Sequence, residues 1–260
     1  MLTGKSTIVT GSTSGIGLGI ARAFAAQGAH LLLNGFGPAE QIEATRSGLE
    51  REFGVKVLYS PADMGRPQDV RALAHLAIEV FGKVDIVVNN AGIQHVAPID
   101  SFPDERWDAV LSINLSSAFH LIKAVVPGMK ARGFGRIINI ASAHGLTASP
   151  FKSAYVAAKH GLIGLSKTVA LELAESGITS NTICPGYVKT PLVEQQIADQ
   201  ARAHGISPEQ VVRDVMLSHQ ARKAFVQVEE LAALAVFLAS DAAASMTGTA
   251  LAMDGGWTLH

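Results

Sequence analysis

The sequence has very little cysteine, few aromatic residues and almost no net charge. Cys184 is the only cysteine among the 260 residues, which excludes an internal disulfide and a cysteine-based zinc cluster. We predict no metal site, and we expect Cys184 to be a small buried side chain. The formal net charge of −1 leaves no basic surface of the kind that binds nucleic acid or an acidic membrane. We therefore expect neither as a partner.

Long hydrophobic runs are also missing. Glycine, asparagine or a charged residue interrupts each run well before the roughly 20 residues that a membrane span needs. The N-terminus, Met-Leu-Thr-Gly-Lys-Ser, leads directly into an apolar run and lacks the segments of a signal peptide. These features predict a soluble cytoplasmic protein.

The sequence does contain an alternation of short apolar runs and longer helical stretches. Strands are predicted at 6–9, 30–34, 55–59, 84–89, 135–141, 179–183 and 249–253. Helices are predicted at 15–27, 40–53, 67–81, 104–132, 153–176, 191–200, 208–219 and 228–240. Strands that are apolar on both faces and alternate with helices predict an α/β protein with a doubly wound parallel sheet, a Rossmann-type three-layer αβα fold.

No repeat, low-complexity tract or linker divides the chain. We therefore expect one dinucleotide-binding domain over residues 1–260. Beyond residue 185 the regular alternation stops, and two helices follow one another without a strand between them. We interpret residues 187–224 as a small helical lid over the C-terminal edge of the sheet.

The turn between the first strand and the first helix is rich in glycine. Its glycines permit a tight turn, close approach of the backbone to a ligand and close packing of the helix, so that backbone N–H groups face a pyrophosphate. An ordinary glycine-rich turn is the alternative, but the position between a strand and a helix favours a dinucleotide. The candidate contacts are Gly11, Thr13, Ser14, Gly15, Ile16 and Gly17.

The end of the second strand favours NAD over NADP. Residues 34–37 read Asn-Gly-Phe-Gly, without the Arg or Lys that would bind the phosphate of NADP and without an acid for the ribose of NAD. Recognition of NAD is left to the backbone, to Asn34 and to stacking by Phe36. Asp63, after the third strand, is a candidate adenine contact, with capping of the following helix as the alternative.

Tyr155 and Lys159 are four residues apart, which places them on one face of a predicted helix. A free tyrosine has a pKa of about 10, too high for a base at neutral pH. A nearby cation favours the phenolate, as the positive nicotinamide ring also would. Alone, such a pair is usually a surface feature. Together with the glycine-rich turn and Ser142 at the preceding strand end, it predicts an acid/base centre.

These motifs together resemble the short-chain dehydrogenase/reductase family, over essentially the whole chain. The resemblance implies Tyr155 as the acid/base and Ser142 as the hydrogen-bond partner of the reacting oxygen. It implies that Lys159 holds the nicotinamide ribose and lowers the pKa of the tyrosine, and that Asn114 orders a water linking Lys159 to solvent. The further cofactor contacts expected at strand ends are Asn90, Ala91, Gly92, Pro185, Gly186, Val188 and Thr190, of which the last two would meet the carboxamide.

Four polar residues are expected to converge over the nicotinamide: Gln94, His144, Lys152 and Gln196. Each alone is more typical of a solvated side chain. A small carboxylate substrate accounts for all four, since Lys152 would meet the carboxylate and the others would complete a hydrogen-bonded cage.

The segments around these residues, and the C-terminal Asp-Gly-Gly-Trp, resemble a bacterial branch of the family. The resemblance implies interconversion of D-3-hydroxybutyrate and acetoacetate with NAD by a homotetramer, with Trp257 near the substrate. Tyr187 stands where that branch has tryptophan, and residues 218–225 also depart from its pattern. A somewhat longer 3-hydroxy acid is therefore an open alternative.

Two other functions are compatible with parts of this sequence. A reductase of carrier-bound 3-oxoacyl thioesters would prefer NADPH, would have little use for Lys152 and would need a basic docking patch, for which Lys130 and Arg132 are thin evidence. A non-catalytic NAD-binding regulator on the same fold would not need Ser142, Tyr155 and Lys159 together.

Overall fold

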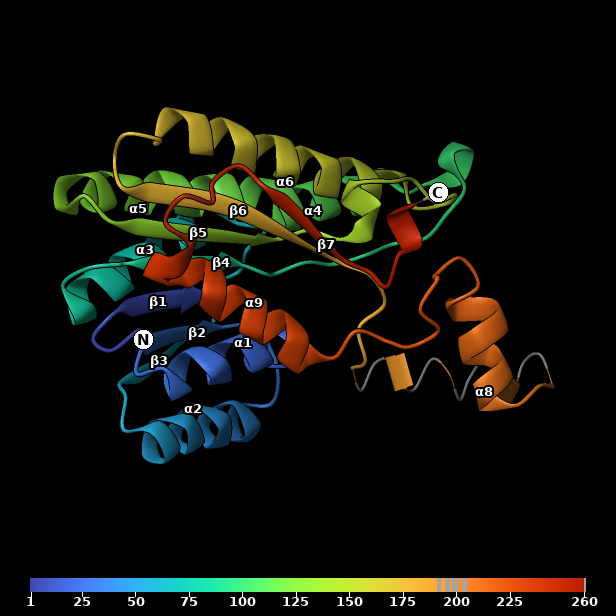
Figure 1. Ribbon diagram of the computed structural model, residues 1–260, viewed down its shortest axis with the longest axis horizontal. Coiled ribbons are helices and arrows are strands. Elements are labelled where there is room, and N and C mark those ends of the chain that lie inside the picture. Colours follow the sequence, from blue (N-terminus) through green and yellow to red (C-terminus); the bar gives the residue numbers. More distant parts are fainter. Residues whose placement is uncertain (191–192, 195–196, 198–200, 203–204, 260) are drawn as a thin grey trace.

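The computed structural model describes residues 1–190, 193–194, 197, 201–202 and 205–259. Its centre is one sheet of seven parallel strands in the order β3-β2-β1-β4-β5-β6-β7 (Figure 1). The order reverses between β1 and β4, which places a ligand crevice beyond the carboxyl ends of these strands. The strands are β1 Ser6–Val9, β2 His30–Asn34, β3 Val57–Ser60, β4 Ile86–Asn89, β5 Gly135–Ile140, β6 Ile178–Pro185 and β7 Ala250–Met253.

Helices cover both faces of the sheet. One layer contains α1 Gly15–Ala26, α2 Ala39–Phe53 and α9 Val228–Ala239, and the other contains α3 Pro67–Phe81, α4 Asp104–Leu111, α5 Ser117–Arg132 and α6 Ser153–Glu172 (Figure 1). The Rossmann-type three-layer prediction is therefore confirmed. The bounds predicted for β1, β2 and α3 agree with the structure residue for residue.

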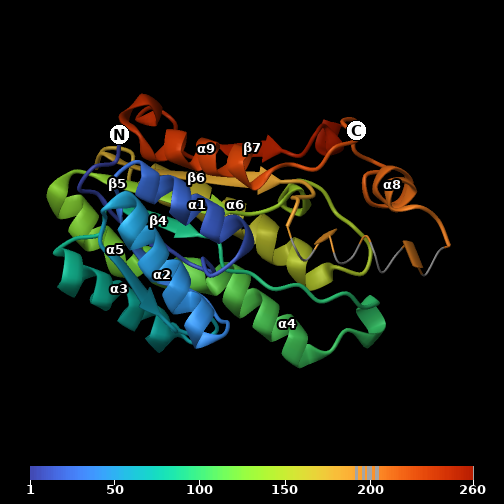
Figure 2. The same cartoon turned by 90° about the horizontal axis from the view of Figure 1, so that it is seen from below.

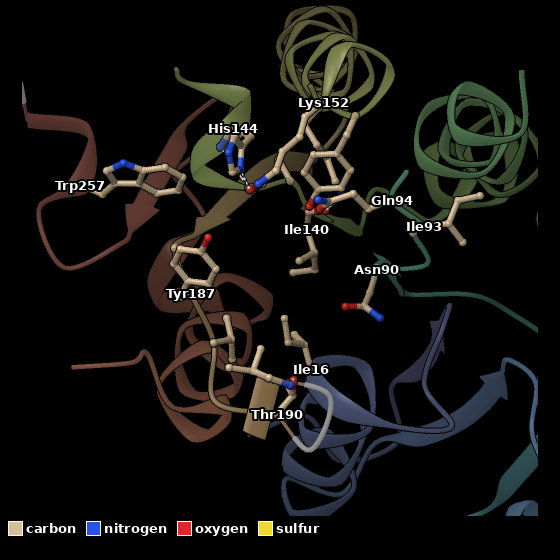
Figure 3. A pocket seen from close by; sticks show the side chains of 18 of the residues that line it. Ile16, Asn90, Ile93, Gln94, Ile140, His144, Lys152, Tyr187, Thr190 and Trp257 are labelled. Carbon is tan, nitrogen blue, oxygen red and sulfur yellow. Dashed lines mark hydrogen bonds between the residues drawn. The ribbon is translucent and has the colours of Figure 1, made fainter. Parts of the chain in front are cut away.

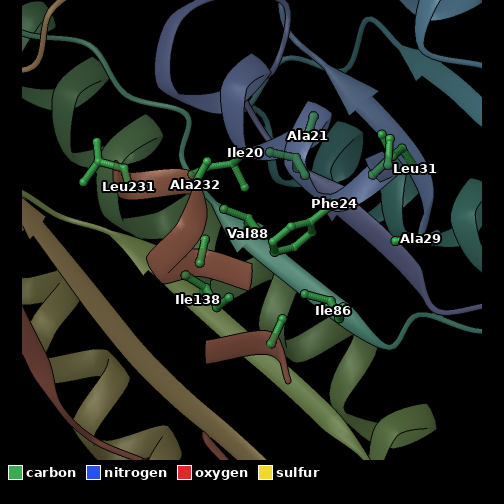
Figure 4. Packing of buried hydrophobic residues seen from close by; sticks show 14 of the residues in the cluster. Ile20, Ala21, Phe24, Ala29, Leu31, Ile86, Val88, Ile138, Leu231 and Ala232 are labelled. Atoms are coloured by element: carbon green, nitrogen blue, oxygen red, sulfur yellow. The ribbon is translucent and has the colours of Figure 1, made fainter. Parts of the chain in front are cut away.

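Alternation along the strands builds two cores. Leu31 and Leu33 of β2 face α1 and α9, where they share a cluster with Phe24, whereas Leu32 faces α3 and α5. Figure 4 shows the first of these clusters, with Phe24 packed between α1 and the central strands. Both faces of β2 are buried from Leu31 to Asn34, which explains why this strand contains a continuous run of leucines.

The predicted helix 104–132 is continuous but not regular. A π-helical turn, Ser112–Ser116, separates α4 from α5. The stretch is long and apolar enough to cross a membrane by length and composition. In this fold, however, α5 packs against α3 and β5, and α4 packs against α6, so it serves as a layer of the domain.

Residues 205–225 lie beyond the carboxyl ends of the strands, as both views show (Figure 2). It contains α8, Pro208–Gln210, which continues into a π-helical turn, Val211–Met216. The helix predicted at 191–200 falls largely outside the described residues. The single domain and the lid over 187–224 therefore stay predictions.

Candidate active site

A cavity of about 980 Å³ opens at the carboxyl edge of the sheet. It is bordered by the ends of β4, β5 and β6 and by the start of α6 (Figure 3). Sequence segments more than 150 residues apart therefore contribute to one site. Its lining residues are Ile16, Asn90, Gly92, Ile93, Gln94, Val96, Ile140, Ala141, Ser142, His144, Lys152, Tyr155, Lys159, Gly186, Tyr187, Val188, Thr190, Val193 and Trp257.

The glycine-rich turn forms a close-fitting cradle. A Cβ on Gly17 would lie 2.2 Å from the Gly11 carbonyl oxygen, and one on Gly11 would lie 2.9 Å from Cα of Ala91. Only glycine fits at these two positions. The described part of α1 makes no capping hydrogen bond with the Ser14 side chain, so the first N–H groups of this helix are available to an anion.

The loop after β2 is held by hydrogen bonds to its backbone. The Thr13 hydroxyl donates to the Phe36 carbonyl oxygen at 3.0 Å, and the Tyr59 hydroxyl donates to that of Gly35 at 2.9 Å. Phe36 itself is exposed, as a stacking surface would be. Asn34 differs from the expectation. Its buried amide accepts from the Gly11 N–H and donates to the carbonyl oxygens of Ser60, at the end of β3, and Ala62, so it holds the turn rather than facing a ribose.

Asp63 does not cap the following helix. The helix α3 begins after Arg66 without a side-chain cap, and Asp63 Oδ1 instead accepts from the Gly65 N–H at 2.8 Å. The capping alternative is therefore wrong. Asp63 is not among the residues that line the cavity, and its contact with adenine stays a prediction.

Tyr155 and Ser142 meet at the centre of the cavity. A hydrogen bond with Ser142 lowers the pKa of the Tyr155 hydroxyl, but burial is the larger effect and raises the pKa above its ordinary value. The ammonium of Lys159 lies 5.5 Å from the centre of the Tyr155 ring. The sequence predicted a lowered pKa for this tyrosine. The protein groups alone give a raised pKa instead.

Lys159 is fully enclosed beneath the tyrosine. Its Nζ donates to the Ile140 carbonyl oxygen at 2.8 Å, and burial lowers its pKa to about 8. Asn114, in the π-helical turn, is bound from both sides by the backbone of Ile93, accepting at 2.8 Å and donating at 2.9 Å. A Cβ on Gly92 would touch Asn114 Oδ1 at 3.4 Å and Lys159 Nζ at 3.7 Å, so these three residues meet.

Aromatic rings form one side of the cavity. His144 stands edge-on to Trp257, with ring centres 4.7 Å apart, and Trp257 stacks on Tyr187 at 6.0 Å. The Tyr187 hydroxyl points into the cavity (Figure 3). His144 is buried, and this lowers its pKa to about 4, so its ring is neutral near pH 7. Among the described residues, none forms a hydrogen bond with the buried His144 Nε2.

Two of the expected cage residues complete the upper part of the cavity. Lys152 extends from the start of α6 toward His144, and Gln94 approaches from the loop after β4 (Figure 3). Burial lowers the pKa of Lys152. Gln196 lies outside the described residues. Three of the four predicted residues, Gln94, His144 and Lys152, therefore line one cavity with Tyr155 and Ser142.

Comparison with known proteins identifies the family. Residues 11–258 match the family model described as "Enoyl-(Acyl carrier protein) reductase", a model of short-chain dehydrogenases. The chain is 57% identical to a D-beta-hydroxybutyrate dehydrogenase of Rhizobium meliloti over 98% of both chains.

The chain belongs to the short-chain dehydrogenase/reductase family.

Other relatives agree with this assignment. A D-beta-hydroxybutyrate dehydrogenase of Cupriavidus necator is 53% identical over 99% of both chains. The L-sorbose reductase of Gluconobacter frateurii, solved with NADPH and L-sorbose, superposes with a TM-score of 0.93 at 35% identity, covering 98% of this chain and 97% of that one. Family membership makes the protein an oxidoreductase.

Several cavity residues of this short-chain dehydrogenase were missed from the sequence. Ile140 and Ala141 directly precede Ser142 at the end of β5. Because ligands bind beyond the carboxyl ends of parallel strands, this position could have indicated both residues. Ile93 and Val96 are apolar residues in a loop, where no sequence pattern indicates which side chain faces a ligand, and Val193 is a helical residue in the segment after β6. Conversely, the predicted residues that lie outside the lining of the cavity are Gly11, Thr13, Ser14, Gly15, Gly17, Phe36, Asp63, Ala91, Asn114 and Pro185.

Proposed function

We propose that this chain catalyses the reversible oxidation of D-3-hydroxybutyrate to acetoacetate with NAD. The observation that carries the proposal is that Lys152, His144 and Gln94 share one cavity with Tyr155 and Ser142. A cation and two neutral polar groups suit a carboxylate, and a tyrosine with a serine suits a secondary alcohol. The names of the relatives at 57% and 53% identity support the same substrate.

Tyr155 is the proposed acid/base. When bound, the nicotinamide supplies the hydride acceptor for C3 of the substrate. The Tyr155 oxygen takes the hydroxyl proton, and the Ser142 hydroxyl donates a hydrogen bond to the developing carbonyl oxygen. Burial alone raises the tyrosine pKa, so the phenolate depends on Ser142, on the Lys159 charge and on the positive cofactor ring. Asn114, held by the Ile93 backbone beside Lys159, is proposed to order the water that connects Lys159 to solvent.

The carboxylate cage would fix the orientation of the substrate. Lys152 supplies the positive charge of the cage. His144 is neutral, so its ring contributes polarity but no second charge. The His144 Nδ1 lies 3.4 Å from the Ser142 Oγ, so the ring is held beside the serine that is proposed to bind the reacting oxygen. Gln94 completes the described part of the cage, and Gln196 is proposed as its fourth member. Holding the carboxylate decides which face of C3 meets the cofactor.

A nicotinamide cofactor suits the glycine-rich turn, because Gly11 and Gly17 let the turn pack tightly and the first N–H groups of α1 have no side-chain cap, so they can bind a pyrophosphate. Thr13, Ser14, Gly15 and Ile16 are the other proposed contacts of this turn. NAD rather than NADP is proposed because residues 34–37 carry no cation for a ribose phosphate. Exposed Phe36 offers a stacking surface instead. The remaining proposed contacts are Asp63, Asn90, Ala91, Gly92, Tyr155, Lys159, Pro185, Gly186, Val188 and Thr190.

Three further proposals concern the lid, the assembly and the length of the substrate. The segment 187–224 would close over bound substrate and exclude water, with Tyr187 and Trp257 packing against the substrate's methyl end. A cytoplasmic homotetramer is proposed from the resemblance to the hydroxybutyrate dehydrogenases. Tyr187, whose hydroxyl faces the cavity, is smaller than the tryptophan of the related branch. A somewhat longer 3-hydroxy acid is therefore the second candidate substrate.

The test is NADH formation from NAD with D-3-hydroxybutyrate, run beside the L-isomer, 3-hydroxyvalerate and lactate and repeated with NADP. Turnover that is D-selective and NAD-dependent is expected. Faster turnover of 3-hydroxyvalerate would favour the longer substrate. Activity confined to NADPH and a 3-oxoacyl thioester would instead favour the reductase alternative. Binding of NAD without turnover of any alcohol would point to a regulator.

A further inference from the structure

Phe151 has a backbone conformation that its side chain disfavours. Its φ is +65°, and no other non-glycine residue in the described part of the chain has a positive φ. Left-handed backbone is costly for a residue with a Cβ, and such strain persists only where the surrounding structure holds it. Phe151 is 58% exposed, so packing of its side chain does not account for the conformation.

The strained residue joins two loops of the cavity. The Phe151 carbonyl oxygen accepts a hydrogen bond from the Ala97 N–H at 2.9 Å. Ala97 follows Gln94 in the loop after β4, and Phe151 directly precedes Lys152, the residue before α6. One backbone hydrogen bond therefore ties together the segments that carry two of the polar residues in the cavity.

Lys152 has little else to fix its direction. It occupies the N-cap position of α6 with φ −123° and ψ 34°, and its side chain makes no capping hydrogen bond within the described helix. The side chain nevertheless enters the cavity, half-buried, and points toward His144 (Figure 3). The turn at Phe151 sets the chain direction from which Lys152 leaves.

We propose that the left-handed backbone of Phe151 is a positioning device that aims Lys152, and with it the loop of Gln94, at the substrate carboxylate. This rests on the proposed function, in which Lys152 binds the carboxylate. The strain is kept because a relaxed backbone would turn the ammonium away from the cavity. Phe151 therefore acts through Lys152 and touches neither the cofactor nor the reacting atoms.

Three variants separate the backbone from the ring. Phe151→Asn and Phe151→Gly remove the ring but accept positive φ, whereas Phe151→Val removes the ring and strongly disfavours positive φ. We expect Phe151→Val to raise the KM for D-3-hydroxybutyrate about tenfold, as a misaimed charged contact would. The kcat, the KM for NAD and the slow oxidation of butan-2-ol, which lacks a carboxylate, should stay unchanged. The Asn and Gly variants should keep the parent KM.

A readout without substrate keeps this inference separate from the proposed function. Hydrogen exchange of the Ala97 amide should accelerate in Phe151→Val, because its acceptor moves, and stay slow in the Asn and Gly variants. If the parent enzyme fails to oxidise D-3-hydroxybutyrate, the proposed function is wrong. The role of Phe151 in aiming Lys152 at a carboxylate is then also wrong, whatever the hydrogen exchange of the Ala97 amide shows. If the parent is active, three results each overturn the inference: an unchanged KM in Phe151→Val, an equal rise in all three variants, or an equal loss with butan-2-ol.

Discussion

Lys159 is a buried ammonium, and its charge lowers the stability of the fold that contains it. Its pKa is about 8 against 10.5 for an ordinary lysine. Each pKa unit corresponds to about 1.4 kcal/mol, so keeping the charge in the folded state costs about 3 kcal/mol at neutral pH. Below pH 8 both the folded and the unfolded chain carry the proton, and the cost is complete. Between pH 8 and 10.5 the folded state alone loses the proton, and stability increases.

Lys159→Met removes the charge while nearly keeping the volume of the side chain. It also removes the 2.8 Å hydrogen bond to the Ile140 carbonyl oxygen, and an unpaired buried carbonyl costs about 1–2 kcal/mol. The difference leaves a net stabilisation of about 1–2 kcal/mol, which for a chain of this size raises Tm by about 2–6 °C. Oxidation of the substrate should fall to near zero, so stability and activity change in opposite directions.

Calorimetric melting at pH 7 and at pH 9.5 measures this effect. The advantage of Lys159→Met should shrink at the higher pH, where the parent has lost its buried charge. Lys130→Met is the matched control, because Lys130 is exposed in the last turn of α5, where its ammonium is in contact with water. A Lys159→Met variant that melts below the parent at pH 7 would refute the reasoning.

Three further predictions follow from the same geometry. Gly17→Ala places a Cβ 2.2 Å from the Gly11 carbonyl oxygen; calorimetric titration should show NAD binding weakened at least about tenfold, whereas Gly48→Ala, which has open space, should bind normally. His144 is neutral in the fold with a pKa of about 4, so the parent should lose up to about 3 kcal/mol of stability as pH falls from 6.5 to 4; equal acid sensitivity in urea melts of His144→Gln would contradict this. Tyr187→Trp narrows the cavity and should reduce kcat/KM for 3-hydroxyvalerate relative to 3-hydroxybutyrate about tenfold; an unchanged ratio would remove Tyr187 as a determinant of chain length.

Most of the fold could be predicted because each element has a strong local signal. β2 is a run of five residues of which the last four are buried, and α3 has proline at its first position and glycine directly after its end. The π-helical turn at Ser112–Ser116 could not be predicted. It accompanies Asn114, whose amide bonds to the Ile93 backbone 21 residues away, a tertiary contact that leaves no periodic pattern.

The site was predictable where polar residues follow strand ends and less so elsewhere. Ser142, Tyr155 and Lys159 are expected and found together in one cavity. The inward orientation of Asn34 was missed, because a sequence does not show that the Asn34 amide accepts a hydrogen bond from the Gly11 N–H of the glycine-rich turn. The conformation of Phe151 was missed for a similar reason, since positive φ without glycine has no sequence signature.

The central claim is that Tyr155 performs the proton transfer in the oxidation of a short D-3-hydroxy acid by NAD. The most direct measurement is NADH formation from D-3-hydroxybutyrate by the parent and by Tyr155→Phe, with NAD affinity determined for both. We predict robust D-selective turnover in the parent, near-complete loss in the variant and equal NAD binding. Turnover retained in Tyr155→Phe, or none in a parent that still binds NAD, would contradict the account.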